Sequence, residues 1–83
     1  MDPLMVIERL GQQISEMRKN RGMTQIDLAA NAGVTRQKLS EIERGKATVS
    51  INLYAKVLAA LGAELTVVAA RRPSFEELRE VFR

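Results

Sequence analysis

Apolar residues recur at helical spacing from the start of the chain. The first set stands three or four positions apart: Leu4, Ile7, Leu10, Ile14 and Met17. This spacing predicts an amphipathic helix over residues 3–20. Asp2 is placed to act as its N-cap and Pro3 suits its first turn. Gly22 then ends the helix.

Two short helices and a longer one are predicted after it. Thr24 caps a helix over 25–31, and Asp27 supplies the acidic member of a capping box. Gly33 provides a residue that tolerates a left-handed turn. Thr35 caps a third helix that runs to about Arg44. The fourth predicted helix spans 51–61, with Ser50 as its N-cap and Gly62 as its end. The pattern therefore predicts an all-α fold up to that point.

The pattern changes after the fourth helix. Residues 64–69 are short and β-branched, which predicts a strand. We expect Leu65, Val67 and Ala69 to face the helices. A lone strand leaves its backbone groups unpaired, so its expected partner is the same strand of a second copy, in an antiparallel ribbon. The residues assigned to this dimer strand are Leu65, Thr66, Val67 and Val68. The alternative is an irregular tail or a helix extension.

The C-terminal residues carry a further helical signal. Arg71, Arg72 and Pro73 break the strand, and Ser74 opens a capping box. The apolar residues of this short amphipathic helix are Phe75, Leu78 and Phe82. The predicted organisation has one helical domain over 1–62, a dimerising strand over 63–70 and a tail over 71–83.

Composition narrows the function classes. The 83 residues contain no cysteine and no histidine, which argues against disulfides, cysteine-based metal sites and the commonest general base. No apolar run approaches the roughly 18 residues of a membrane helix, and the N-terminus lacks the features of a signal peptide. We expect a cytoplasmic protein that is not an enzyme, with no cofactor, no metal and no membrane partner.

The positive charge is concentrated in one segment. Although the whole chain has a net charge of +3, residues 18–46 carry seven basic and three acidic side chains. Such a cluster is often only a solvated face, but its concentration also suits a polyanionic partner.

The same segment contains the features of a helix-turn-helix. Two short helices that cross steeply need a small residue at their contact, and Ala29 provides it. Inward anchors are expected at Ile26, Leu28, Val34, Leu39 and Ile42. The outward face of the third helix then presents Thr35, Arg36, Gln37, Ser40, Glu41 and Arg44. An ordinary helical hairpin is the alternative, but the spacing, the polar face and the charge together favour a helix that reads DNA.

Residues 11–62 resemble the Cro/C1-type (XRE-family) helix-turn-helix. The resemblance lies in Ile14 and Arg18, in MTQxxLA over 23–29, in AGV over 32–34, in LSEIERG over 39–45 and in AALG over 59–62. It implies a compact lambda-repressor-like bundle of about five helices, an ion pair between Arg18 and Glu43 that serves as scaffold, and a phosphate contact from Gln25.

The chemistry of the DNA major groove predicts which residues of the outward face contact bases and which contact phosphates. In the major groove arginine can pair with guanine and glutamine with adenine, so Arg36 and Gln37 are the expected base readers. Thr35 and Lys38 reach bases or nearby phosphates. Two interpretations of Glu41 stay open, since it either accepts from a cytosine amino group or orients a neighbouring cation. The expected phosphate contacts besides Gln25 are Ser40, Arg44, Lys46, Lys19 and Arg21, the last two with solvation as the alternative.

One such helix reads few base pairs, so we expect a homodimer on a palindromic operator in double-stranded DNA. The segment LGAELTVVAARRP over 61–73 resembles HipB-type antitoxins. That resemblance implies a repressor of its own operon that holds a HipA-type toxin kinase. The alternatives are a stand-alone phage-like repressor, a restriction-modification controller protein, or an adaptor whose helix-turn-helix no longer binds DNA.

Overall fold

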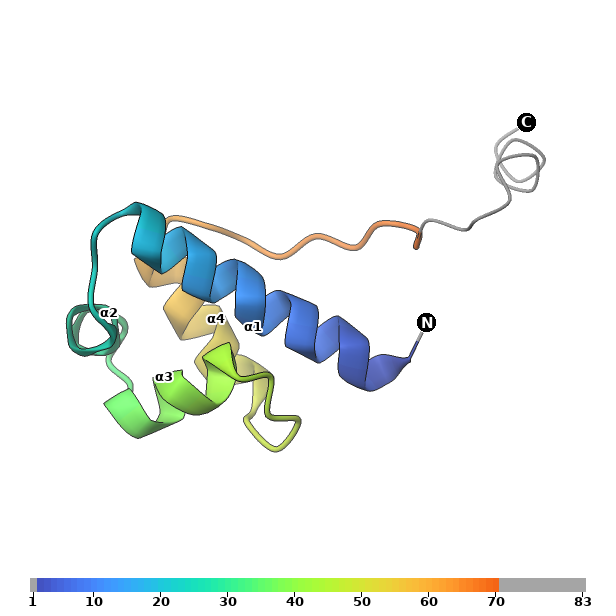
Figure 1. Cartoon of the computed structure of the whole chain (residues 1–83), viewed down its shortest axis with the longest axis horizontal. Coiled ribbons are helices and arrows are strands. Elements are labelled where there is room, and N and C mark those ends of the chain that lie inside the picture. Colours follow the sequence, from blue (N-terminus) through green and yellow to red (C-terminus); the bar gives the residue numbers. More distant parts are fainter. Residues whose placement is uncertain (1, 71–83) are drawn as a thin grey trace.

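Four helices make up the computed structural model, which describes residues 2–70. They are α1 (Pro3–Asn20), α2 (Gln25–Ala32), α3 (Arg36–Glu43) and α4 (Ile51–Ala60). Figure 1 shows α2 and α3 at one side of the long α1, with α4 behind it. The predicted all-α class is confirmed, and each helix lies within one residue of its expected bounds. The helix predicted in the tail lies outside the described residues.

Side-chain caps start three of the four helices. The Oδ1 atom of Asp2 accepts from the N–H of Leu4 at 2.8 Å. Thr24 and Asp27 form the predicted reciprocal capping box, with both bonds at 3.1 Å. Ser50 is the N-cap of α4 as predicted, although its side chain makes no capping bond. Ser50 has the extended backbone of an N-cap, and only its carbonyl bonds to the first turn.

The core lies where the three short helices meet α1. Contacts join α1 to α3, and α2 to both α3 and α4. Five side chains are fully enclosed there: Ile14, Leu28, Leu39, Ile42 and Val57. Tyr54 is also buried, which raises the pKa of its hydroxyl, and that hydroxyl donates to the carbonyl of Lys46 at 3.2 Å. This bond attaches the loop after α3 to α4.

A glycine lets α1 and α3 approach closely. Gly11 is buried in the middle of α1. A Cβ atom added there would overlap the carbonyl oxygen of Ile42 and lie 3.0 Å from that of Glu43. The backbones of the two helices are therefore in direct contact at a position that tolerates no larger residue.

Some residues expected to be inside are outside. Ile26 is 66% exposed, so it is not the inward anchor that the sequence predicted, and Leu4 at the start of α1 is 53% exposed. Val67 is 98% exposed in the single chain, and its predicted packing against the helices belongs to the dimer ribbon and stays a prediction. Residues 63–70 leave the end of α4 as an extended segment (Figure 1), and no strand forms within residues 2–70. A strand needs a pairing partner, so pairing between two copies stays a prediction.

Candidate nucleic-acid interface

The turn between α2 and α3 has the geometry that the sequence suggested. Gly33 adopts φ +71°, a left-handed conformation that ordinary residues rarely take. The N–H groups of Gly33 and Val34 donate back to the carbonyls of Ala30 and Ala29, which closes α2. Ala29 is buried, as expected for a residue at the helix contact. The chain then starts α3 at once, with the Thr35 hydroxyl accepting from the N–H of Lys38 at 3.0 Å.

The third helix has one buried face and one exposed polar face. Leu39 and Ile42 are 0% exposed and fix the inner face of the helix against the core. The first turn of α3 points outward instead, and its exposed residues are Thr35, Arg36, Gln37 and Lys38. Arg36 and Gln37, the expected base readers, therefore lie on one exposed turn together with Thr35 and Lys38. Glu41 lies one turn further on and is half-buried, and its carboxylate pairs with the Lys38 ammonium at 3.5 Å.

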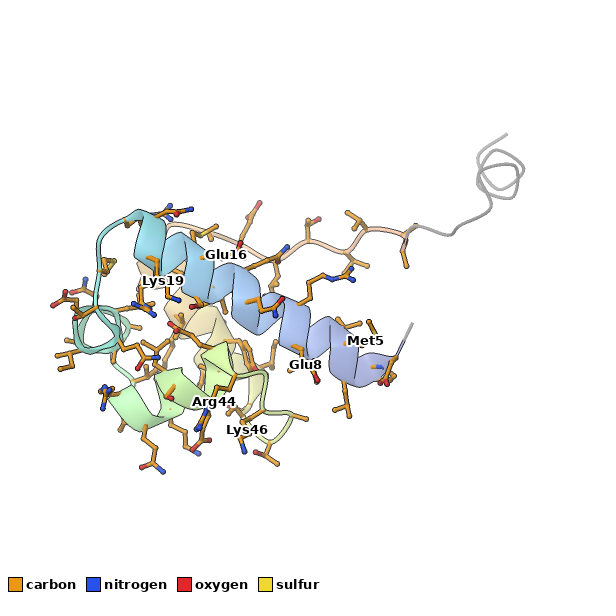
Figure 2. All side chains as sticks on the ribbon, in the orientation of Figure 1. Met5, Glu8, Glu16, Lys19, Arg44 and Lys46 are labelled. Atoms are coloured by element: carbon orange, nitrogen blue, oxygen red, sulfur yellow. The ribbon has the colours of Figure 1, made fainter. Side chains whose placement is uncertain are left out.

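The cations expected to bind phosphate form two groups along the chain. Arg44 and Lys46 are exposed at the end of α3 and in the loop after it (Figure 2). Lys19 and Arg21 are exposed at the end of α1, where the Arg21 guanidinium donates to the carbonyl of Met17 at 3.3 Å. Ser40 is half-buried on α3. The structure thus brings the first group next to the exposed helix and leaves the second at a different helix end.

An ion pair fixes α3 against α1. The Arg18 guanidinium donates to the two carboxylate oxygens of Glu43 at 2.7 and 3.0 Å, and to the carbonyl of Met23 at 2.8 Å. The two side chains are only 10% and 6% exposed. Burial alone would raise the pKa of Glu43, but hydrogen bonds from Arg18 and Gln25 and the charge of Arg18 outweigh it and hold that pKa below its ordinary value. The same hydrogen bond raises the pKa of Arg18. Both groups are therefore charged and are not exposed toward a ligand.

Gln25 belongs to this cluster, which the sequence did not suggest. Its Nε2 atom donates to Oε1 of Glu43 at 3.1 Å. Gln25 is the first residue of α2, so the bond joins the start of α2 to the end of α3. An amide nitrogen carries two N–H groups, and Glu43 takes one of them. No local pattern links residues 18 positions apart, which is why only the folded chain reveals the contact.

Neither a metal site nor a membrane span is found among the described residues. Residues 2–70 contain no group of three or more carboxylate, histidine or cysteine side chains arranged to hold a metal. No helix in the same range is long and apolar enough to cross a membrane.

Known proteins similar to this chain share its helix-turn-helix. The Helix-turn-helix family (HTH_3) matches residues 14–68. The immunity repressor protein of Bacillus phage phi105 is 32% identical over 68 residues, which are 82% of this chain and 47% of the repressor, so the chain spans about half of that protein. An HTH-type transcriptional regulator of Methanothermobacter thermautotrophicus is 43% identical over 51 residues, 61% of this chain and 74% of that protein.

Two solved structures have the same fold. The chain matches one described as MDT Protein with a TM-score of 0.70 and 23% identity, covering 77% of this chain and 90% of the other. It matches a HipB variant in a complex with an O2 20mer with a TM-score of 0.71 and 23% identity, covering 77% and 89%. The predicted lambda-repressor-like bundle is confirmed. The predicted resemblances to XRE-family helix-turn-helix proteins and to HipB are also confirmed. The chain belongs to the helix-turn-helix family of DNA-binding transcriptional regulators.

Proposed function

We propose that this protein is a sequence-specific transcriptional repressor that binds a palindromic operator as a dimer. The observation that carries the proposal is the exposed first turn of α3, where polar side chains stand free of the core while Leu39 and Ile42 fix the helix behind them. An α-helix fits the major groove of B-DNA, and the residues at its exposed start contact the base edges.

Within this turn, Arg36 and Gln37 are the proposed base readers. Arginine makes paired bonds to guanine and glutamine to adenine, and both side chains are exposed. Thr35 contributes a hydroxyl beside them. Lys38 reaches a base or a phosphate, and its ion pair with Glu41 favours the interpretation in which Glu41 orients this cation.

The remaining polar residues are proposed to hold the DNA backbone. Gln25 stands at the start of α2, and the start of a helix favours an anion such as a phosphate. Its second amide N–H extends that donor set while Glu43 holds the first. Arg44 and Lys46 add positive charge beside α3. Ser40, Lys19 and Arg21 are the further backbone contacts of this proposal.

The dimer is supported by the segment after α4. Within residues 2–70, the last backbone–backbone hydrogen bond runs from the N–H of Ala63 to the carbonyl of Leu58, and residues 64–70 make none. A pair of such segments would satisfy each other in an antiparallel ribbon built from Leu65, Thr66, Val67 and Val68. Two copies place two reading helices on one operator, which suits the symmetry of a palindrome.

Selection of bound sequences from random DNA tests the proposal. We expect a single palindromic consensus, and binding of the selected duplex that weakens steeply as salt is raised. Equal affinity for selected and scrambled duplexes would reject sequence-specific reading. Absence of salt-dependent binding to either duplex would favour an adaptor that has lost DNA binding.

Two biological settings suit such a repressor, which would act in the cytoplasm. The fold shared with HipB supports an autoregulating antitoxin that binds a HipA-type toxin kinase. The phage immunity repressor among the relatives supports a stand-alone repressor, and a restriction-modification controller protein is a further stand-alone form. Co-purification with the product of the adjacent gene distinguishes them. A stable complex with a kinase-like product favours the antitoxin, whereas DNA binding with no such neighbour favours the stand-alone forms.

A further inference from the structure

An open apolar groove separates the first half of α1 from the segment that leads into α4. Its volume is about 220 Å³, and its lining includes Ile7, Leu10, Val49, Ile51 and Tyr54. Ile51 is 66% exposed at its edge. No side chain of residues 2–70 fills this groove.

The extended segment over residues 63–70 carries unpaired apolar side chains of its own. Leu65 and Val67 share one face of an extended chain, since side chains alternate, and they are 50% and 98% exposed. The helices of the same chain therefore do not cover Val67. A two-stranded ribbon alone is only marginally stable in water and needs a hydrophobic surface to pack on. The proposed dimer ribbon therefore needs an apolar surface on which Leu65 and Val67 can pack.

Charge on the two features is complementary. Lys46 is the one charged residue in the lining of the groove. Glu64 is the one charged residue in the segment 63–70, and it forms no ion pair within residues 2–70. Opposite charges at the edge of a groove and at the start of the segment favour their association.

We propose that, in the dimer, the segment 63–70 of each copy packs its Leu65 and Val67 side chains into the α1–α4 groove of the other copy. This inference rests on the proposed homodimer and identifies the surface that stabilises it. The occupant is a second copy because one chain exposes both the apolar segment and the groove, and each supplies what the other lacks. Reciprocal packing of this kind is what a two-fold interface requires.

Cross-linking between differently labelled copies tests the proposal, because the chain has no cysteine. One copy carries Val67→Cys and the other carries Ile51→Cys, and a short thiol-to-thiol reagent is added to the mixture. We expect a covalent dimer that joins the two differently tagged copies. The matched control replaces Ile51→Cys by Ile26→Cys, since Ile26 is equally exposed, at 66%, but lies on α2 and not in the groove. We expect this control to remain uncross-linked.

The outcomes separate this inference from the proposed function. Sedimentation that gives a dimer without the Val67–Ile51 cross-link would overturn the packing and leave the dimeric repressor intact. A cross-link formed within one chain that carries both cysteines, at dilutions where it is monomeric, would assign the groove to the chain's own segment and also overturn it. A monomer at all concentrations and on DNA would reject the homodimer and the packing together.

Substitutions on the two faces of the segment provide an independent measurement. Val67→Asp puts a charge on the face proposed to enter the groove, and Val68→Asp puts it on the opposite face. Both valines are exposed in the single chain, at 98% and 76%, so neither change should unfold it. We expect Val67→Asp to raise the dimer dissociation constant by about tenfold or more, and Val68→Asp to have the smaller effect. Equal effects of the two substitutions would contradict the packing.

Discussion

Removing the charge of Glu43 is expected to destabilise the fold strongly. Glu43→Gln keeps the size and shape of the side chain but replaces one carboxylate oxygen by an amide group. The guanidinium of Arg18 then keeps its burial and loses its counter-charge, since the two side chains are 10% and 6% exposed. The carboxylate accepts two hydrogen bonds from the Arg18 guanidinium, at 2.7 and 3.0 Å. In the variant the amide nitrogen, itself a donor, would face one of these two N–H groups.

The size of the effect follows from this burial. Breaking a buried ion pair by removing one partner costs about 3–5 kcal/mol. The amide oxygen can still accept one bond, so we expect a loss near the lower end, about 3 kcal/mol. At about 0.05–0.15 kcal/mol per residue, a chain of this length has a stability of about 4–12 kcal/mol. The substitution therefore removes a large fraction of it.

A second pair on the same helix supplies the control. Glu41 pairs with Lys38 at 3.5 Å, and these side chains are 18% and 47% exposed. An exposed pair at this helical spacing contributes only about 0.2–0.5 kcal/mol, so Glu41→Gln should change stability little. Urea unfolding followed by circular dichroism at 222 nm measures both free energies of unfolding. Equal losses in the two variants would refute the argument from burial, as would a Glu43→Gln protein as stable as the parent.

Three further predictions concern packing, pH and DNA. Gly11→Ala should destabilise the fold by about 1–3 kcal/mol, because its Cβ atom would overlap the carbonyl of Ile42; a thermal melt unchanged from the parent would contradict this. The lowered pKa of Glu43 implies a contribution to stability that is complete above its unfolded pKa of about 4.3 and is lost as pH falls through the lower folded pKa. Below about pH 4.3 the parent should therefore lose stability more steeply than Glu43→Gln in urea titrations. Arg44→Gln should weaken DNA binding equally on all duplexes and reduce the salt dependence of the binding constant by about one in slope. Loss of discrimination at a single base pair would instead make Arg44 a base reader.

The helices could be predicted from the sequence because their signals are local. Apolar spacing and the capping residues Asp2, Thr24 and Thr35 depend only on near neighbours in the chain. The turn at Gly33 was predictable for the same reason, since few other residues adopt its backbone conformation. Ser50 had the right position and residue type for a cap, but whether its hydroxyl bonds to the helix depends on a side-chain rotamer that sequence does not fix.

Burial and long-range contacts could be predicted less well from the sequence. Ile26 and Val67 stand where an apolar residue would face a core, but whether a surface lies opposite them depends on the folded chain and its partners. The bond from Gln25 to Glu43 joins residues far apart in sequence, and no periodic pattern encodes it. Gly11 carried a signal that could have been used, because glycine weakens the middle of a helix and its presence there suggests that another backbone passes close by.

The central claim, that the first turn of α3 reads base identity, is tested most directly by measuring the affinity of Arg36→Ala. The parent and the variant are titrated against the selected operator and against duplexes that each carry one altered base pair. We predict a loss of about 1–3 kcal/mol on the operator, with discrimination lost at one base pair and kept at the others. Uniform weakening on every duplex would make Arg36 a phosphate contact, and unchanged affinity would remove it from the interface.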